Sequence, residues 1–216
     1  MSTATASPRG AEIRRWQPEP PDVAADLVLR LQHYRDPARA PRAIREAAAV
    51  AAAEGARLTS PEAVIWRGPV TGLEADGRVT LGGTQHFRSA LLARLLAHST
   101  EAYVVVLTLG PALECRVDEL FSTRCEFEGL LLETAGWAAI LMLARRLRRR
   151  LRDDERPAGG SVTHRVAPGY GDWPVDDQRT LLAVFGDVAL PVTVNDAAWM
   201  LPRKSISGVF GVMAAR

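Results

Sequence analysis

The sequence predicts an α+β domain: a helical N-terminal portion, a meander of short strands, a long core helix, and strands that close a sheet. Three observations support this prediction. Alanine-rich and leucine-rich stretches recur at helical spacing. A continuous β-branched run lies between them, which is typical of a buried strand. Short stretches separated by Gly-Pro, Asp-Gly and Gly-Gly are typical of antiparallel strands joined by turns.

Two helices are predicted in the N-terminal portion. Residues 22–34 form a short one, and residues 41–54 a second, because Pro41 suits a first turn, the alanines favour helix and Gly55 supplies a stop. Residues 1–20 are rich in Ala, Ser, Thr and Pro and are predicted to be a disordered lead. They lack the apolar stretch of a signal peptide, so we expect a cytoplasmic protein.

The middle of the chain alternates strands and helices. The meander is predicted over residues 63–67, 73–75, 78–81 and 85–87. A helix over 89–98, with its leucines on the inner side, precedes a buried strand over 102–109. Another helix begins at Pro111.

A long helix is predicted from about Phe127 to Asp153, with Ile140, Leu143, Leu147 and Leu151 on one side. Its apolar run is too short and too interrupted to span a bilayer, so no membrane segment is expected. After a loop at 157–161 the sequence predicts a helix over 175–185 and strands over 189–195 and 206–214.

The formal net charge of +2 gives the molecule no strong field toward nucleic acid or a membrane. The charge is uneven, because six arginines crowd the end of the long helix at positions 145, 146, 148, 149, 150 and 152. Cations there suit the helix dipole, so a solvated helix end is one interpretation. A docking patch for an acidic partner protein is the other. No aromatic residues are interleaved, which disfavours nucleic acid.

Catalytic and metal sites are not predicted. Cys115 and Cys125 are ten residues apart without a neighbouring histidine, which favours buried or idle thiols. The four histidines are scattered, with no pair at ligand spacing. The motifs Gly-x-Ser-x-Gly, Gly-x-Gly-x-x-Gly and the Walker loop are missing. Whether the protein is an enzyme stays open.

The most informative segment is Arg165-Val-Ala-Pro-Gly-Tyr. A guanidinium can hold a carboxylate in a forked pair, glycine lets a ligand approach the backbone, and tyrosine offers a flat wall with a polar tip. The segment therefore predicts a clamp for a small zwitterionic ligand. Lys204, farther along the chain, is on its own interpreted as a surface residue.

The chain resembles the activation (reactivation) domain of cobalamin-dependent methionine synthase in its free-standing form. The hexapeptide, Pro174 and Met200-Leu-Pro-Arg-Lys-Ser-Ile-Ser-Gly carry the resemblance, together with Thr108-Leu-Gly-Pro-Ala-Leu-Glu and Gly169-Tyr-Gly-Asp-Trp-Pro. It implies a curved antiparallel sheet with helices and one domain over residues 21–216. Residues 21–125 would be its helical and meander portion, and residues 126–216 its S-adenosylmethionine-binding portion.

The resemblance also implies site residues. Arg165 would engage the carboxylate of S-adenosylmethionine, the backbone of Ala167 and Gly169 would meet the ligand, and Tyr170 would follow as the aromatic. Asp196 and Ser205 are assigned to the same site by position. The family has a carboxylate on the long helix, where this chain has Leu141-Met-Leu-Ala-Arg-Arg. Arg145 at this place would repel a cationic ligand. The carboxylate of Glu133 lies roughly two to three helical turns earlier.

By resemblance, the protein is an accessory to the reductive reactivation of a corrinoid methyltransferase in methionine biosynthesis. S-adenosylmethionine would be its ligand, cobalamin would be carried by the partner protein, and a flavodoxin or ferredoxin would supply an electron. No corrinoid-binding Asp-x-His-x-x-Gly occurs in this chain. The alternative is a non-catalytic interaction module that docks a corrinoid protein without binding S-adenosylmethionine.

Overall fold

An antiparallel sheet of eight strands runs through the computed structural model, which describes residues 4–7 and 10–214. Its strands follow the order β1-β2-β3-β6-β10-β7, with β4 paired to β3 and β5 to β4. Their bounds are β1 (Ala4–Ser7), β2 (Ala11–Trp16), β3 (Glu62–Leu73), β4 (Arg78–Leu81), β5 (Gln85–Arg88), β6 (Glu101–Thr108), β7 (Ser161–Val162) and β10 (Ser205–Met213). A separate hairpin pairs β8 (Thr193–Val194) with β9 (Met200–Leu201). The predicted α+β class is confirmed.

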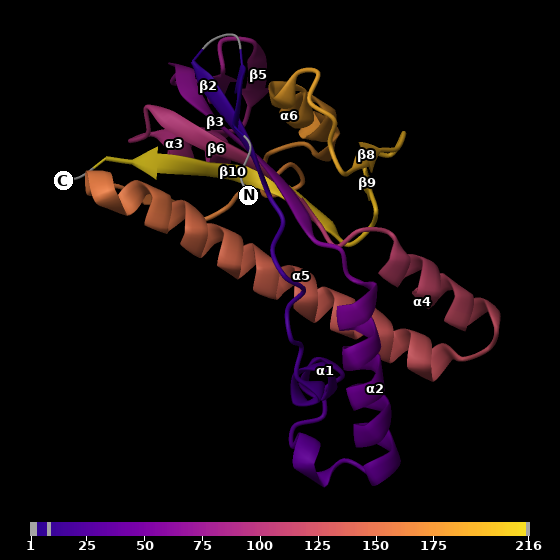
Figure 1. Cartoon of the computed structure of the whole chain (residues 1–216). Helices are drawn as coiled ribbons and strands as arrows, with labels where there is room; N and C mark the ends of the chain where they lie inside the picture. The colour runs from indigo at the N-terminus through magenta and orange to yellow at the C-terminus, as the bar shows by residue number, and fades with distance from the viewer. Residues whose placement is uncertain (1–3, 8–9, 215–216) are drawn as a thin grey trace.

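The helices divide between the two faces of this sheet (Figure 1). Helix α5 lies along one face, where α1, α2 and α4 pack around its N-terminal half, while α3 and α6 cover the other face. Their bounds are α1 (Ala25–Leu31), α2 (Arg42–Leu58), α3 (Ala90–Leu96), α4 (Ala112–Ser122), α5 (Glu126–Glu155) and α6 (Gln178–Leu182). Short 3-10 turns include η3 (Val175–Asp177) before α6 and η4 (Ala183–Phe185) after it.

Strand β6 lies in the centre of the sheet and separates two apolar cores. Val105 and Leu107 point to the core beneath α5, whereas Val104 and Val106 point to the core beneath α3 and α6. Successive side chains of a strand alternate between faces, and both faces are covered here. The continuous β-branched run that predicted a buried strand is therefore explained by burial on both sides.

The expected disordered lead over residues 1–20 is wrong for residues 4–7 and 11–16, which form β1 and β2. Residues 1–3 and 8–9 lie outside the described residues. Strand β2 pairs with β3, placing Ile13 opposite Trp66 in the apolar core. Its flanking Arg14 and Arg15 form ion pairs with Asp154 and Glu62. One buried side chain among polar neighbours carries little strand signal in a sequence.

Two predicted breaks are also wrong. Gly55 does not stop α2, which continues to Leu58 and packs Gly55 against Ala135 and Leu132 of α5. Gly68-Pro69 is not a turn, because β3 continues through it as one strand. The Trp66 ring fills the space that a Cβ at position 68 would need, 2.3 Å away. The strand predicted over 189–195 shortens to Thr193–Val194.

Helix α5 with its following turn, residues 126–158, is long and apolar enough by composition to cross a membrane. Within its most apolar window, however, 56% of the helix is buried inside the protein. A core helix passes the same composition test. The leucines that the sequence placed on one side of this helix, at 143, 147 and 151, are all buried.

Candidate functional site

The predicted clamp lies in the loop between β7 and η3, where it runs along the edge of β10. Val166 and Val209 exchange two backbone hydrogen bonds across this edge, at 3.2 and 2.8 Å. The loop is thus held to the sheet in the middle of the segment, and the side chain of Arg165 is placed next to β10.

Arg165 lies over Gly208 of β10 and against Tyr170. Its Nη2 donates to the Tyr170 hydroxyl at 2.8 Å, its Nη1 donates to the Ser207 carbonyl, and its guanidinium lies 5.4 Å from the centre of the tyrosine ring. These bonds engage two of the five N–H donors of an arginine. The other three donors have no hydrogen-bond partner among the described residues, and they are enough for a forked pair with a carboxylate.

Gly208 makes this arrangement possible. Its φ of +153° and its surroundings both exclude a side chain, since a Cβ would lie 2.6 Å from the Val166 carbonyl oxygen and 2.7 Å from Cγ of Arg165. The preceding Ser207 donates to Gln178 of α6 at 2.8 Å, and both side chains are buried. Neither role was predicted from the sequence, although both residues belong to the segment from Met200 to Gly208 that carries the resemblance.

A tight turn orients Tyr170. The N–H of Gly169, at φ +89°, donates to the Trp173 carbonyl at 2.8 Å, and the N–H of Tyr170 donates to the Ala167 carbonyl at 3.1 Å. Ala167 is buried at 5% exposure, whereas the Tyr170 side chain is 46% exposed. The backbone groups assigned to ligand contact therefore partly serve the turn itself, and the tyrosine ring faces solvent beside Arg165.

Asp172 fastens this loop to α3. Its carboxylate accepts hydrogen bonds from the Ser89 hydroxyl at 2.8 Å and from the N–H groups of Ala90 and Leu91 at 2.6 and 3.1 Å. The Ser89 hydrogen bond, followed by those of the α3 backbone, lowers the pKa of Asp172. The aspartate belongs to the quoted Gly-Asp-Trp-Pro motif, but its capping role depends on a helix far away in the sequence.

The other two predicted site residues lie apart from this pair. The Ser205 hydroxyl is 2.8 Å from Oγ1 of Thr108 and 2.6 Å from the Pro202 carbonyl oxygen, so it closes the end of β10. Asp196 is exposed in the turn of the β8–β9 hairpin and makes no hydrogen bond or ion pair with any described residue. No described contact joins either residue to Arg165 or Tyr170.

The overall structure is similar to a solved structure, described as the MetH reactivation domain bound to AdoHcy. The TM-score is 0.59 and the identity 12%, with 92% of this chain and 78% of that chain covered. This chain has the reactivation-domain fold. No protein-family model matches the sequence, and no curated protein matches it. The fold that the sequence resemblance implied is thus confirmed.

Within the reactivation-domain fold, α5 of this chain carries a carboxylate that is already paired with a cation. Glu133 pairs with Lys204, whose Nζ also lies 5.1 Å from the centre of the Trp137 ring. Lys204 is only 4% exposed, so its interpretation as a surface residue is wrong. Lys204 balances the charge of Glu133, and Arg145 farther along α5 is exposed and cationic, so neither residue offers an unpaired carboxylate to an ammonium group.

The described residues hold no cluster of three or more His, Cys, Asp and Glu side chains suited to a metal ion. Cys115 is exposed and Cys125 half-buried, and both are free thiols. What the arrangement offers chemically is an oriented guanidinium beside an exposed aromatic ring, on a rigid sheet edge. An arrangement of this kind is chemically suited to holding a carboxylate.

Proposed function

We propose that this protein binds S-adenosylmethionine and takes part, in the cytoplasm, in the reductive reactivation of a cobalamin-dependent methyltransferase such as methionine synthase. One observation carries the proposal: Arg165 is held over Gly208 and against Tyr170, with three donors left, in a chain whose fold is that of a domain solved with AdoHcy. The partner protein would carry the cobalamin.

The residues that support this function act by positioning. Arg165 takes the carboxylate of the methionine moiety, and the exposed ring of Tyr170 flanks it. Methyl transfer from the sulfonium to the partner's corrinoid, after one-electron reduction by a flavodoxin or ferredoxin, requires no proton transfer. The protein therefore needs orientation of the methyl donor more than acid–base groups.

Replacement of Arg165 by alanine tests the proposal. Loss of one forked, charge-assisted pair removes about 1.5–3 kcal/mol, so we expect S-adenosylmethionine to bind about ten- to a hundredfold more weakly. Isothermal titration calorimetry measures this. Arg42→Ala, on the exposed face of α2, is the matched control and should leave the affinity unchanged. A wild-type protein that binds no ligand at millimolar concentration contradicts the proposal.

A second candidate is a non-catalytic module that docks a corrinoid protein without S-adenosylmethionine. The closed Glu133–Lys204 pair and the exposed Arg145 favour it, because both disfavour a cationic ligand near α5. Reactivation of an oxidised corrinoid methyltransferase, measured with and without S-adenosylmethionine, separates the two candidates. The module should raise no activity in either case, while still binding the partner.

A further inference from the structure

Two adjacent residues outside the clamp hold its two sides. The strand side is Ser207, whose carbonyl accepts a hydrogen bond from Arg165, and the turn side is the turn that carries Tyr170. Asp177, which ends η3, is hydrogen-bonded to the turn side, and Gln178, which begins α6, is hydrogen-bonded to the strand side. Both sides of the clamp therefore meet at the junction of η3 and α6.

Gln178 holds the strand side. Its side chain is buried, and its Oε1 accepts the Ser207 hydroxyl at 2.8 Å. The hydroxyl and the carbonyl belong to the same residue, so a bond that fixes the hydroxyl also restricts the carbonyl. That carbonyl accepts a hydrogen bond from Nη1 of Arg165. The direction of the guanidinium is thus linked to a buried amide on the other face of the sheet.

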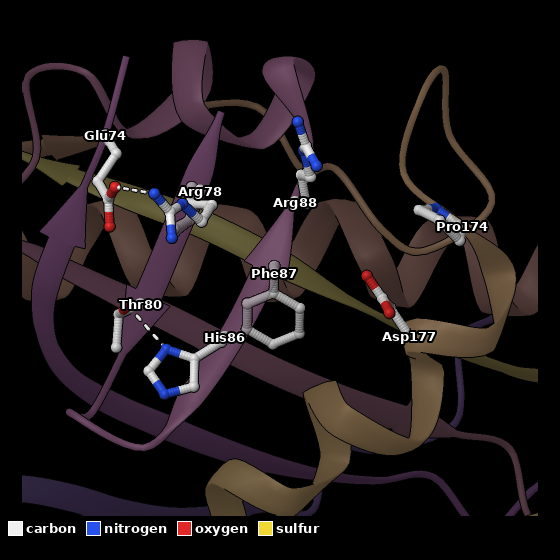
Figure 2. A pocket seen from close by; sticks show the side chains of 9 residues that line it. Glu74, Arg78, Thr80, His86, Phe87, Arg88, Pro174 and Asp177 are labelled. Carbon is white, nitrogen blue, oxygen red and sulfur yellow. Dashed lines mark hydrogen bonds and ion pairs between the residues drawn. The ribbon is translucent and has the colours of Figure 1, made fainter. Parts of the chain in front are cut away.

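Asp177 holds the turn side through Trp173. Its Oδ2 accepts the indole N–H at 2.9 Å, and Phe87 meets the indole edge to face, with ring centres 5.5 Å apart. Figure 2 shows Phe87 on the β4–β5 hairpin and Asp177 on the chain that enters α6. The Trp173 backbone accepts the Gly169 N–H at 2.8 Å and donates to the Tyr170 carbonyl at 3.0 Å. A tryptophan fixed from two sides therefore shapes the turn.

We propose that Asp177 and Gln178 are positioning residues of the clamp. Each acts through another residue, Gln178 on Arg165 and Asp177 on Tyr170. The inference rests on the proposed function, because it assumes that the guanidinium receives the ligand's carboxylate. A forked pair needs two N–H donors in fixed directions. A guanidinium that turns freely should therefore hold the carboxylate less well, while contacts to the rest of the ligand stay the same.

Ser207→Ala and Gln178→Leu test the strand side. Ser207→Ala keeps the carbonyl that accepts Arg165 and removes only the hydroxyl. Each variant should bind S-adenosylmethionine about three- to tenfold more weakly in calorimetry, because one neutral hydrogen bond is lost. The double variant should lose no more than either single variant, since both remove the same bond. Affinity for decarboxylated S-adenosylmethionine, which lacks the carboxylate, should stay at the wild-type value.

Asp177→Asn and Asp177→Leu test the turn side. Asparagine keeps an oxygen that accepts the Trp173 indole N–H, so wild-type affinity is expected, whereas leucine should weaken binding about three- to tenfold. Asp176→Leu, at the exposed neighbouring position, is the matched control and should leave the affinity unchanged. All variants are compared at temperatures well below their unfolding transitions. Equal losses in Asp177→Asn and Asp177→Leu would overturn the role of this hydrogen bond.

A measurement without ligand separates this inference from the proposed function. NMR of nitrogen-labelled arginine side chains reports rotation of the Arg165 guanidinium, whose two Nη atoms are both hydrogen-bonded. Separate Nη1 and Nη2 signals are expected in wild type, merging in Ser207→Ala and Gln178→Leu. This result without any binding of S-adenosylmethionine would refute the proposed function and support the positioning role. Signals unchanged in both variants, or equal losses of affinity for the two ligands, overturn the positioning role.

Discussion

At the scale of single residues, the clamp depends on what surrounds Arg165. Arginine, glycine and tyrosine within six positions predict a ligand-binding segment. The orientation of the guanidinium, however, comes from the Ser207 carbonyl and from the missing side chain of Gly208. Both lie about forty residues away in the sequence, so local pattern alone does not reveal them.

Lys204 and Glu133 illustrate how burial decides the cost of losing one partner of an ion pair. Lys204 is 4% exposed and Glu133 is 28% exposed. Glu133→Met leaves a buried, unpaired ammonium, so we expect a loss of about 3 kcal/mol in unfolding free energy. Lys204→Met leaves a carboxylate that water can reach, and the expected loss is about 1 kcal/mol.

Urea denaturation of both methionine variants, with the double variant, measures this asymmetry. The double variant removes both charges and should be more stable than Glu133→Met alone, because no unpaired charge is left in the protein. Equal losses in the two single variants would show that Lys204 is solvated once its partner is gone.

At the scale of elements, helix packing determines where glycine is tolerated. The sequence interpretation treated Gly55 as the end of α2, since glycine favours helix termini. In the fold, α2 continues to Leu58, because Gly55 lies on the face of α2 that packs against α5. Gly136 of α5 is packed more closely, against Leu113 and Lys204.

The two glycines should respond oppositely to alanine. A Cβ at Gly55 would meet Ala135 at 3.4 Å and Leu132 at 3.6 Å, ordinary contacts, so Gly55→Ala should stabilise by about 0.5–1 kcal/mol. A Cβ at Gly136 would meet Leu113 at 2.9 Å, so Gly136→Ala should destabilise by about 1–3 kcal/mol. The unfolding temperatures of the two variants, compared with that of wild type, test this prediction. Destabilisation by Gly55→Ala would contradict the packing described.

At the scale of the whole molecule, the arginines of α5 fall into two groups. Arg146 and Arg148 donate to the carbonyls of Glu19 and Thr163, and Arg150 lies 5.8 Å from the centre of the Trp16 ring. These three tie the N-terminal segment and the loop after β7 to the helix. The side chains of the others, at positions 145, 149 and 152, make no hydrogen bond or ion pair with a described residue.

The second group is the better candidate for docking an acidic partner. Changing Arg145, Arg149 and Arg152 together to glutamine should weaken association with a corrinoid protein at low salt, and should remove most of its salt dependence. Surface plasmon resonance at two ionic strengths measures both effects. The unfolding temperature should stay close to that of wild type, because the three side chains make no hydrogen bond or ion pair within the described part of the chain. Binding that is insensitive to salt in the wild type argues against docking through this group.

The matched control at this scale is the change of Arg148 and Arg150 to glutamine. These residues contact Thr163 and Trp16, so their loss should lower the unfolding temperature. The comparison distinguishes arginines that contribute only surface charge from arginines whose contacts stabilise the fold.

The α+β class, the buried strand β6 and the long helix α5 were predictable from sequence, because each depends on the spacing of residues close together in the chain. Strand β2, the continuation of α2 through Gly55 and that of β3 through Gly68 were not, since their stability comes from partners far away in the sequence. The same holds for the site. The sequence determined that Arg165 and Tyr170 are close together in the chain. Only the tertiary structure decided that Gly208 makes room for the arginine side chain and that Asp172 holds the loop against α3 by hydrogen bonds. It also decided that Lys204 forms an ion pair with Glu133. Local spacing encodes periodicity, whereas burial, packing and pairing of charges arise only when distant segments meet.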